Sequence, residues 1–269
     1  MNCTALNHTD VSKSATKSST HPSANVIVAA LNNTALALIS QGKNEEAINL
    51  LGNALSAPAA GSLLSSSSVL DDESMPSTMR SSAFSEGDPI VFTRNADDPF
   101  SASPDLQLPD KLVEAASPSN FFTIYNRVIE IADISSFKWE RYSSHIPAIL
   151  LYNSGLAWHK IAFRENCDAK YERALENYSA AHSQLIYHAS LGMYHPEVCD
   201  VLLLALCNNM GHIHSHFIRL EETRLCIEAL FTVFFMIGNK RILSKEEYVF
   251  FYMNILLTVN RTPVLAPAA

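Results

Sequence analysis

The stretch NNMGHIHSHFIRLEETRLCIEAL, residues 208–230, gives the clearest indication of the fold. Apolar or small side chains recur at helical spacing on both sides of a central break: Cys207, Gly211 and His214 before it, and Thr223, Ile227 and Leu230 after it. This spacing places each set on one face of a helix. A small residue at position 211 lets a neighbouring helix approach closely. The stretch therefore predicts two packed helices joined by a turn.

The same pattern occurs twice more in the chain. Residues 29–55 contain Leu31, Ala35 and Leu38, a turn at Gly42, and then Ala47, Leu51 and Ala54. The other copy contains Leu151, Gly155 and Trp158, an extended turn over residues 164–171, and then Ala174, Tyr178 and Ala181. A helix pair of this kind cannot bury its apolar face alone, so neighbouring pairs are expected to stack.

These three helix pairs resemble the tetratricopeptide repeat family, whose unit is a helix–turn–helix of about 34 residues. The resemblance implies a concave surface, lined by the first helix of each pair, that recognises extended peptides or partner helices. The repeats are degenerate: Thr223 stands where the family usually has alanine, and His214 where it usually has an aromatic residue.

We therefore expect a mainly α fold of antiparallel helix-pair repeats, a TPR-like α-solenoid with a small β-hairpin and a long disordered acidic insertion. The predicted organisation is a disordered tail (1–24), a first helix pair (25–58), an acidic Ser/Pro-rich insertion (59–118), a helical repeat region (119–262) and a tail (263–269). Further helices are predicted at about 149–163, 169–189, 197–217 and 221–237, with a capping helix at 244–259.

Two short segments have the composition of strands. Residues 90–94 (IVFTR) and 122–131 (FTIYNRVIEI) are rich in β-branched and aromatic residues and are expected to pair as a hairpin. The alternative is a helix over 121–134, because its apolar residues also follow helical spacing.

The charge excludes one class of partner. The chain has 269 residues and a formal net charge of −8, and residues 61–118 alone carry ten acidic against three basic residues. A basic nucleic-acid surface is therefore not expected. No segment is apolar over the length needed to span a bilayer, so no membrane partner is expected. The first 24 residues read as a plain tail, with a transit peptide as the alternative. Five cysteines without a CxxC pair suit a reducing compartment, which predicts a cytoplasmic protein, with the nucleus as the alternative.

The expected partner is a protein or peptide bound on the concave face. Asn33, Asn153 and Asn209 each lie two positions before the small residue of a first helix. An amide there can donate to and accept from a peptide backbone at the same time. The alternative role for these asparagines is hydrogen bonding between helices.

Histidines supply the other candidates for partner binding: His159, His212 and His216. His212 and His216 are four residues apart on one helix face, where they could bind zinc together. No glutamate or cysteine pair completes a known zinc motif, so neither a metal nor another cofactor is expected.

No motif of nucleophilic, phosphate-binding or acid/base chemistry occurs, so the chain is not expected to be an enzyme. The sequence thus predicts an interaction adaptor or scaffold. One alternative is a helical enzyme or metal-binding protein that uses His212 and His216. Another is a structural subunit that assembles, with a second copy among the candidate partners, through the apolar helix at 244–259.

Overall fold

A computed structural model describes residues 24–57, 90–93, 122–131, 143–237 and 242–261. The tail predicted at residues 263–269, the tail predicted at residues 1–24 except Ala24, and the acidic insertion except residues 90–93 lie outside these ranges, and so does the disorder expected there.

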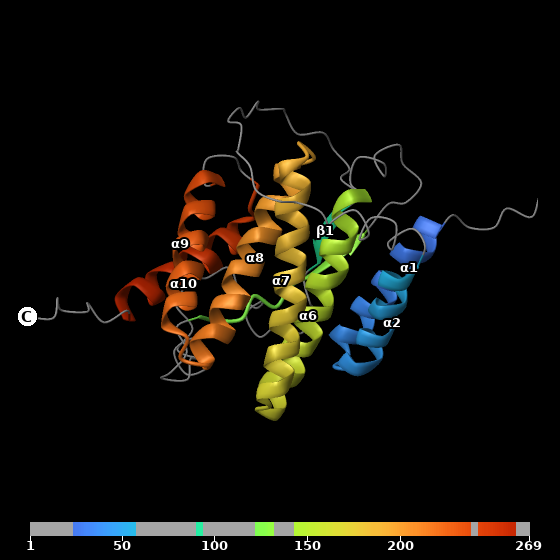
Figure 1. Ribbon diagram of the computed structural model, residues 1–269, viewed down its shortest axis with the longest axis horizontal. Coiled ribbons are helices and arrows are strands. Elements are labelled where there is room, and N and C mark those ends of the chain that lie inside the picture. Colours follow the sequence, from blue (N-terminus) through green and yellow to red (C-terminus); the bar gives the residue numbers. More distant parts are fainter. Residues whose placement is uncertain (1–23, 58–89, 94–121, 132–142, 238–241, 262–269) are drawn as a thin grey trace, which may run out of the picture.

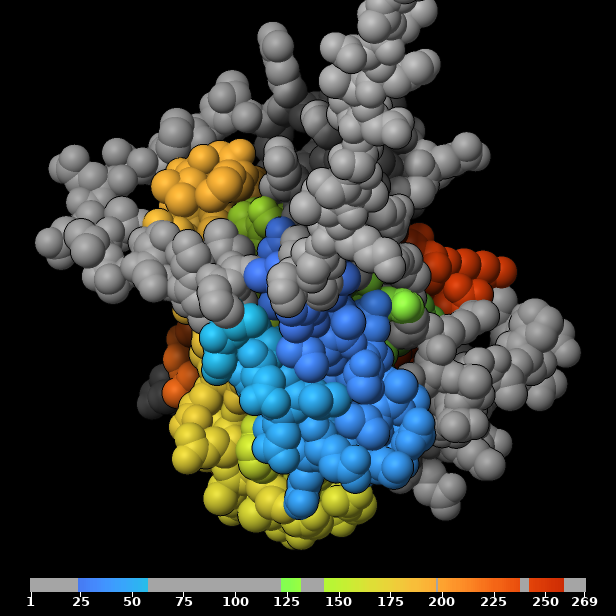
Figure 2. Space-filling view, turned by 90° about the vertical axis from the view of Figure 1, so that its right-hand side faces the viewer, coloured from blue at the N-terminus to red at the C-terminus, as the bar shows by residue number. Residues whose placement is uncertain are grey.

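Within the described residues the fold is mainly helical and built from packed helix pairs, as the sequence predicted. Its α-helices are α1 (Ala24–Ser40), α2 (Asn44–Ser56), α6 (Ile146–Glu165), α7 (Asp168–Ser190), α8 (Pro196–His216), α9 (Leu220–Ile237) and α10 (Lys245–Arg261), and a short 3-10 helix, η2 (Ser143–His145), precedes α6. From α1 to α9, successive helices pack on one another in a row, and α10 crosses α9 and also contacts α8 (Figure 1). The α1–α2 pair, blue and cyan in Figure 2, forms one end of the molecule.

Four turns between helices share one backbone conformation. In each, a single residue has positive φ: Gly42 (76°), Asn166 (49°), Gly192 (73°) and Ile218 (56°). The N–H of the next residue then bonds to a carbonyl five positions back, as in the bond from Arg219 N–H to the oxygen of His214 at 2.9 Å. This is the Schellman ending of a helix, in which a left-handed residue reverses the chain and satisfies orphan carbonyls. The turns are therefore short and alike.

One predicted turn is wrong. The sequence suggested an extended connection over residues 164–171, but α6 continues to Glu165 and α7 starts at Asp168. Asn166 adopts the left-handed conformation that asparagine tolerates better than most residues, so two residues suffice to reverse the chain.

The two predicted strands pair with each other. β1 (Ile90–Thr93) runs antiparallel to β2 (Val128–Ile131), with Ile90 opposite Ile131 and Thr93 opposite Val128. The alternative of a helix over 121–134 is wrong for the described residues 122–131. Strand pairing is shorter than predicted: residues 122–127 have no partner strand in the part of the chain that the structure describes.

The small residues of the helix-pair pattern do allow close approach, although not always to a helix. A Cβ on Gly155 would lie 2.7 Å from the ring of Tyr178, which belongs to the second helix of the same pair. A Cβ on Gly211 would instead lie 2.4 Å from the ring of Phe122. The expectation that Gly211 makes room for a neighbouring helix is therefore wrong, because an extended segment distant in sequence fills that space.

Candidate functional site

Residues 122–131, called here the inner segment, cross the row of helices from α10 to α1. Figure 1 shows the segment in light green, running across the helices. Backbone groups of residues 123, 125, 127, 129 and 131 all bond to helix side chains. In an extended chain the backbone polar groups of alternate residues point to the same side. One edge of the inner segment is therefore bound along its length.

Asparagines form most of these contacts in a repeated geometry. Asn153 of α6 accepts from the N–H of Ile129 at 3.0 Å and donates to its carbonyl at 2.9 Å. Asn33 of α1 does the same for Ile131, accepting at 3.1 Å and donating at 2.8 Å. Each amide thus satisfies both polar groups of one peptide residue, as a neighbouring strand would do.

The pattern continues at the other end of the segment. Asn209 of α8 accepts from the N–H of Tyr125 at 2.8 Å and donates to its carbonyl at 3.1 Å. Asn254 of α10 holds Thr123 in the same way, at 3.0 and 3.3 Å. We call Asn33, Asn153, Asn209 and Asn254 the asparagine row. The asparagine row contacts the backbone of the inner segment and not its side chains, since the bonds involve only backbone N–H and C=O groups.

Other side chains hold the row in place. Asn153 also donates to Oδ1 of Asn32 at 2.9 Å, and Asn254 donates to Oδ1 of Asn208 at 2.8 Å. Asn32 and Asn208 in turn donate to carbonyls of the inner segment. The backbone-binding role and the interhelical role considered for these asparagines therefore coexist in Asn153.

A buried polar chain lies behind Asn209. Its amide donates to the hydroxyl of Tyr178 at 3.2 Å, which lies 3.3 Å from Nδ1 of His159. Nε2 of His159 is 3.0 Å from Nδ1 of His212. Burial lowers the pKa of both imidazoles, that of His212 to about 3. Both rings are therefore neutral at pH 7. The chain of hydrogen bonds is complete when the Tyr178 hydroxyl donates to Nδ1 of His159 and the Nε2–H of His159 donates to Nδ1 of His212.

The three predicted histidines thus do not form one surface. His159 and His212 are buried together behind the asparagine row. His216, one turn further along α8, is only partly buried, with Nε2 3.1 Å from a carboxylate oxygen of Asp168. Among the described residues, no group of three or more histidine, cysteine or acidic side chains is placed to hold a metal ion.

Glu247 is a site residue that the sequence analysis did not single out. Its Oε1 accepts from the hydroxyl of Tyr125 at 2.9 Å and lies 3.1 Å from the guanidinium of Arg127. Its Oε2 accepts from the N–H of Ser244 at 2.9 Å, and its own N–H donates to Oγ of Ser244. This is a capping box at the start of α10. Burial and the negative charge of Glu247 raise the pKa of the Tyr125 phenol, which keeps its proton.

A second group of histidines lies at the start of α6. The ring of His145 is centred 5.3 Å from that of His195 and 6.0 Å from that of His188. The sequence spacing of these three residues gave no sign of a cluster. Burial, together with the neighbouring His195 and His188, lowers the pKa of His145 to about 4. Cys199 also lies here, with Sγ 3.7 Å from Nε2 of His145.

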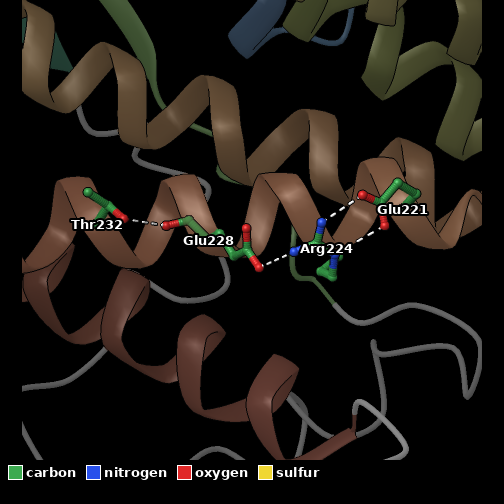
Figure 3. A network of polar contacts seen from close by, with 4 residues as sticks. All are labelled: Glu221, Arg224, Glu228 and Thr232. Carbon is green, nitrogen blue, oxygen red and sulfur yellow. Dashed lines mark hydrogen bonds and ion pairs between the residues drawn. The ribbon is translucent and has the colours of Figure 1, made fainter. Parts of the chain in front are cut away.

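The last helix pair has an exposed aromatic face. Phe231 and Phe235 of α9, and Tyr248 and Tyr252 of α10, keep 41–57% of their surface exposed. Another part of α9 is polar, where Arg224 bonds to Glu221 and Glu228 (Figure 3). Helix α10 thus contributes Glu247 and Asn254 on one side and apolar surface on the other.

Asn254 could have been found from the sequence. It is a single amide within the apolar run from Val249 to Val259, where an unpartnered polar group would be costly. The same argument applies to the pairs Asn32–Asn33 and Asn208–Asn209, of which only one member was singled out.

Comparison with known proteins gives no relative: no family profile, curated protein or solved structure matches the chain. None of the helices that the structure describes combines the length and apolar character needed to cross a membrane.

Proposed function

We propose that this chain is a protein-interaction adaptor whose asparagine row binds an extended segment of a partner protein. The frame would be a degenerate TPR-like array, as the resemblance of its three helix pairs implies. The observation that carries the proposal is the repeated contact of Asn153, Asn209, Asn33 and Asn254 with both polar groups of alternate peptide residues. A surface of this kind recognises any chain that can lie extended along it.

The energetics of the row allow one occupant to replace another. Asn153 and Asn209 have no exposed surface while the inner segment covers them. Release of this segment would exchange its N–H and C=O groups for water, and each such hydrogen bond is worth only about 0.5–1.5 kcal/mol net. An extended partner that supplies the same backbone groups would therefore fit the positions that the inner segment occupies within this chain.

Selection of peptides from a random 12-residue display library by the full-length chain tests the proposal. Selected peptides should lose binding when N-methylated at alternate amides that face the row, and keep it when methylated at the intervening amides. This comparison leaves the protein unchanged. Failure to select any peptide, or equal loss at both sets of amides, would refute backbone recognition.

A second candidate is self-assembly through the aromatic face of α9 and α10. The exposed rings of Phe231, Phe235, Tyr248 and Tyr252 favour it, because exposed large apolar side chains on two helices that pack together are typical of interaction surfaces. Light scattering over a range of concentrations tests it: a dimer that Phe235→Glu converts to monomer supports this function, and a monomer at every concentration removes it.

A further inference from the structure

The row accounts for binding of backbone, but the end formed by α8 and α10 also distinguishes side chains. Gly211 leaves room for the ring of Phe122, which lies where any other residue would place its Cβ. Tyr125 is buried, with its ring 4.9 Å from that of Phe251 and 5.3 Å from that of Phe250. These contacts fit aromatic side chains at two positions three residues apart.

Glu247 adds a charge requirement next to these aromatic contacts. Glu247 is 5% exposed, and one oxygen of its carboxylate accepts from the N–H of Ser244 at the start of its own helix. The other oxygen faces the inner segment, where Tyr125 and Arg127 supply a hydroxyl and a positive charge. A ligand without such donors would leave a buried carboxylate partly unpaired, which is strongly unfavourable. The start of α10 thus orients the carboxylate of Glu247, whereas the segment bound on the row supplies the positive charge that neutralises it.

The helices also pack on one another directly, but the inner segment contributes Phe122, Tyr125, Val128, Ile129 and Ile131 to the buried core, so an occupant that replaces it must supply comparable apolar side chains. α1 packs on α2, α2 on α6, α6 on α7, α7 on α8 and α8 on α9 directly. The inner segment is also separated in sequence from α6, the next long helix, by residues 132–142 and the short η2.

We propose that the partner is an extended segment with the pattern aromatic–x–x–Tyr–x–Arg. Gly211 makes room for the first aromatic ring, and Glu247 binds the tyrosine hydroxyl and the arginine. Residues 122–131 are the chain's own copy of this pattern, which the partner displaces. This inference rests on the proposed function and adds the chemistry of the ligand to it. A tethered segment has an effective concentration of about 1 mM, so it competes with any free ligand. The partner must therefore bind more tightly than the resident segment or be present when that segment is released.

The test uses a labelled synthetic peptide of residues 119–132 and the full-length chain, followed by fluorescence anisotropy. Tyr125→Ala in the chain weakens the resident copy and should increase affinity for the peptide at least about tenfold relative to wild type. Arg173→Ala in α7 is the control, because this exposed side chain pairs with Glu176 of its own helix, and it should leave affinity unchanged.

Specificity is measured with a second peptide that carries Arg127→Gln. The Tyr125→Ala chain should bind it about tenfold more weakly than the original peptide. The difference should disappear in the Tyr125→Ala/Glu247→Gln chain, because glutamine forms the hydrogen bond but carries no charge. Equal binding of both peptides by the folded Tyr125→Ala chain would overturn the inference, while the proposed function would stand on backbone recognition alone. Absence of peptide binding would overturn both.

Hydrogen exchange of the wild-type chain keeps the inference testable if Tyr125→Ala does not fold. The amides of Tyr125 and Ile129 should exchange at least about 100-fold faster than those in the centre of α6, through release of the segment without global unfolding. If the amides of the inner segment and those of α6 exchange at the same rate, the segment is not released separately, and the proposed displacement is wrong. A wild-type dimer that trades inner segments between copies would place a second copy on the row and overturn a separate partner.

Discussion

Replacement of Gly211 by alanine should lower the free energy of unfolding when residue 122 is phenylalanine and raise it when residue 122 is alanine. The new Cβ would lie 2.4 Å from Phe122, where ordinary contacts are 3.4 Å or longer, so the ring must shift by about 1 Å. Overpacking of this kind costs about 1–3 kcal/mol, and alanine recovers about 0.5–1 kcal/mol of helix propensity. Gly211→Ala should therefore destabilise the wild type by about 1–2 kcal/mol. In a Phe122→Ala background the ring is absent, and the same change should stabilise by up to about 1 kcal/mol.

Urea unfolding followed by circular dichroism gives the free energies for this double-mutant cycle. Gly52→Ala in α2 is the matched control, since no atom lies within 4 Å of its Cβ position. It should give the same small gain in both backgrounds. An equal effect of Gly211→Ala with and without Phe122 would show that the inner segment does not occupy this position, and would remove the basis for aromatic recognition there.

Three further results are expected. Asn153→Ala should lower the free energy of unfolding by about 2–4 kcal/mol, because it leaves the buried amide of Ile129 unpaired, whereas Asn177→Ala on the exposed face of α7 should change it by less than about 0.5 kcal/mol in the same urea titration. The pKa of His145 is about 4 in the folded chain and about 6.5 in the unfolded chain, so only the unfolded chain binds this proton between these pH values. The associated stability is complete above pH 6.5, falls as the pH drops towards 4, and is reduced by about 2 kcal/mol at pH 5, and His145→Gln should flatten the measured pH dependence in this range. Ile218→Asn should raise the thermal midpoint, since a β-branched residue at a φ of 56° costs about 1 kcal/mol and its side chain is exposed; an unchanged or lower midpoint would contradict the left-handed turn.

Helical periodicity was sufficient to predict the helices. The bounds expected for α7, α8 and α9 lie within one residue of those in the structure, because apolar spacing, Pro196 and acidic first turns mark where helices begin. The turn after α6 was missed since no glycine marks it, and asparagine there gave no distinct signal. Repeated spacing pointed to three members of the asparagine row, Asn33, Asn153 and Asn209, whereas Asn254, like Glu247, lies on a helix outside the three matched pairs.

The sequence by itself determined the helix pairs, the two short strands and the polar groups suited to holding a peptide backbone. These features depend on residues close together in the chain, so their periodicity is readable without coordinates. Only the tertiary structure decided what the asparagines hold. Asn33 and Ile131 are 98 residues apart, and Tyr125 and Glu247 are 122 apart. Contacts at such separations leave no periodic signal, because they are selected by packing of the whole chain and not by the local spacing of either partner.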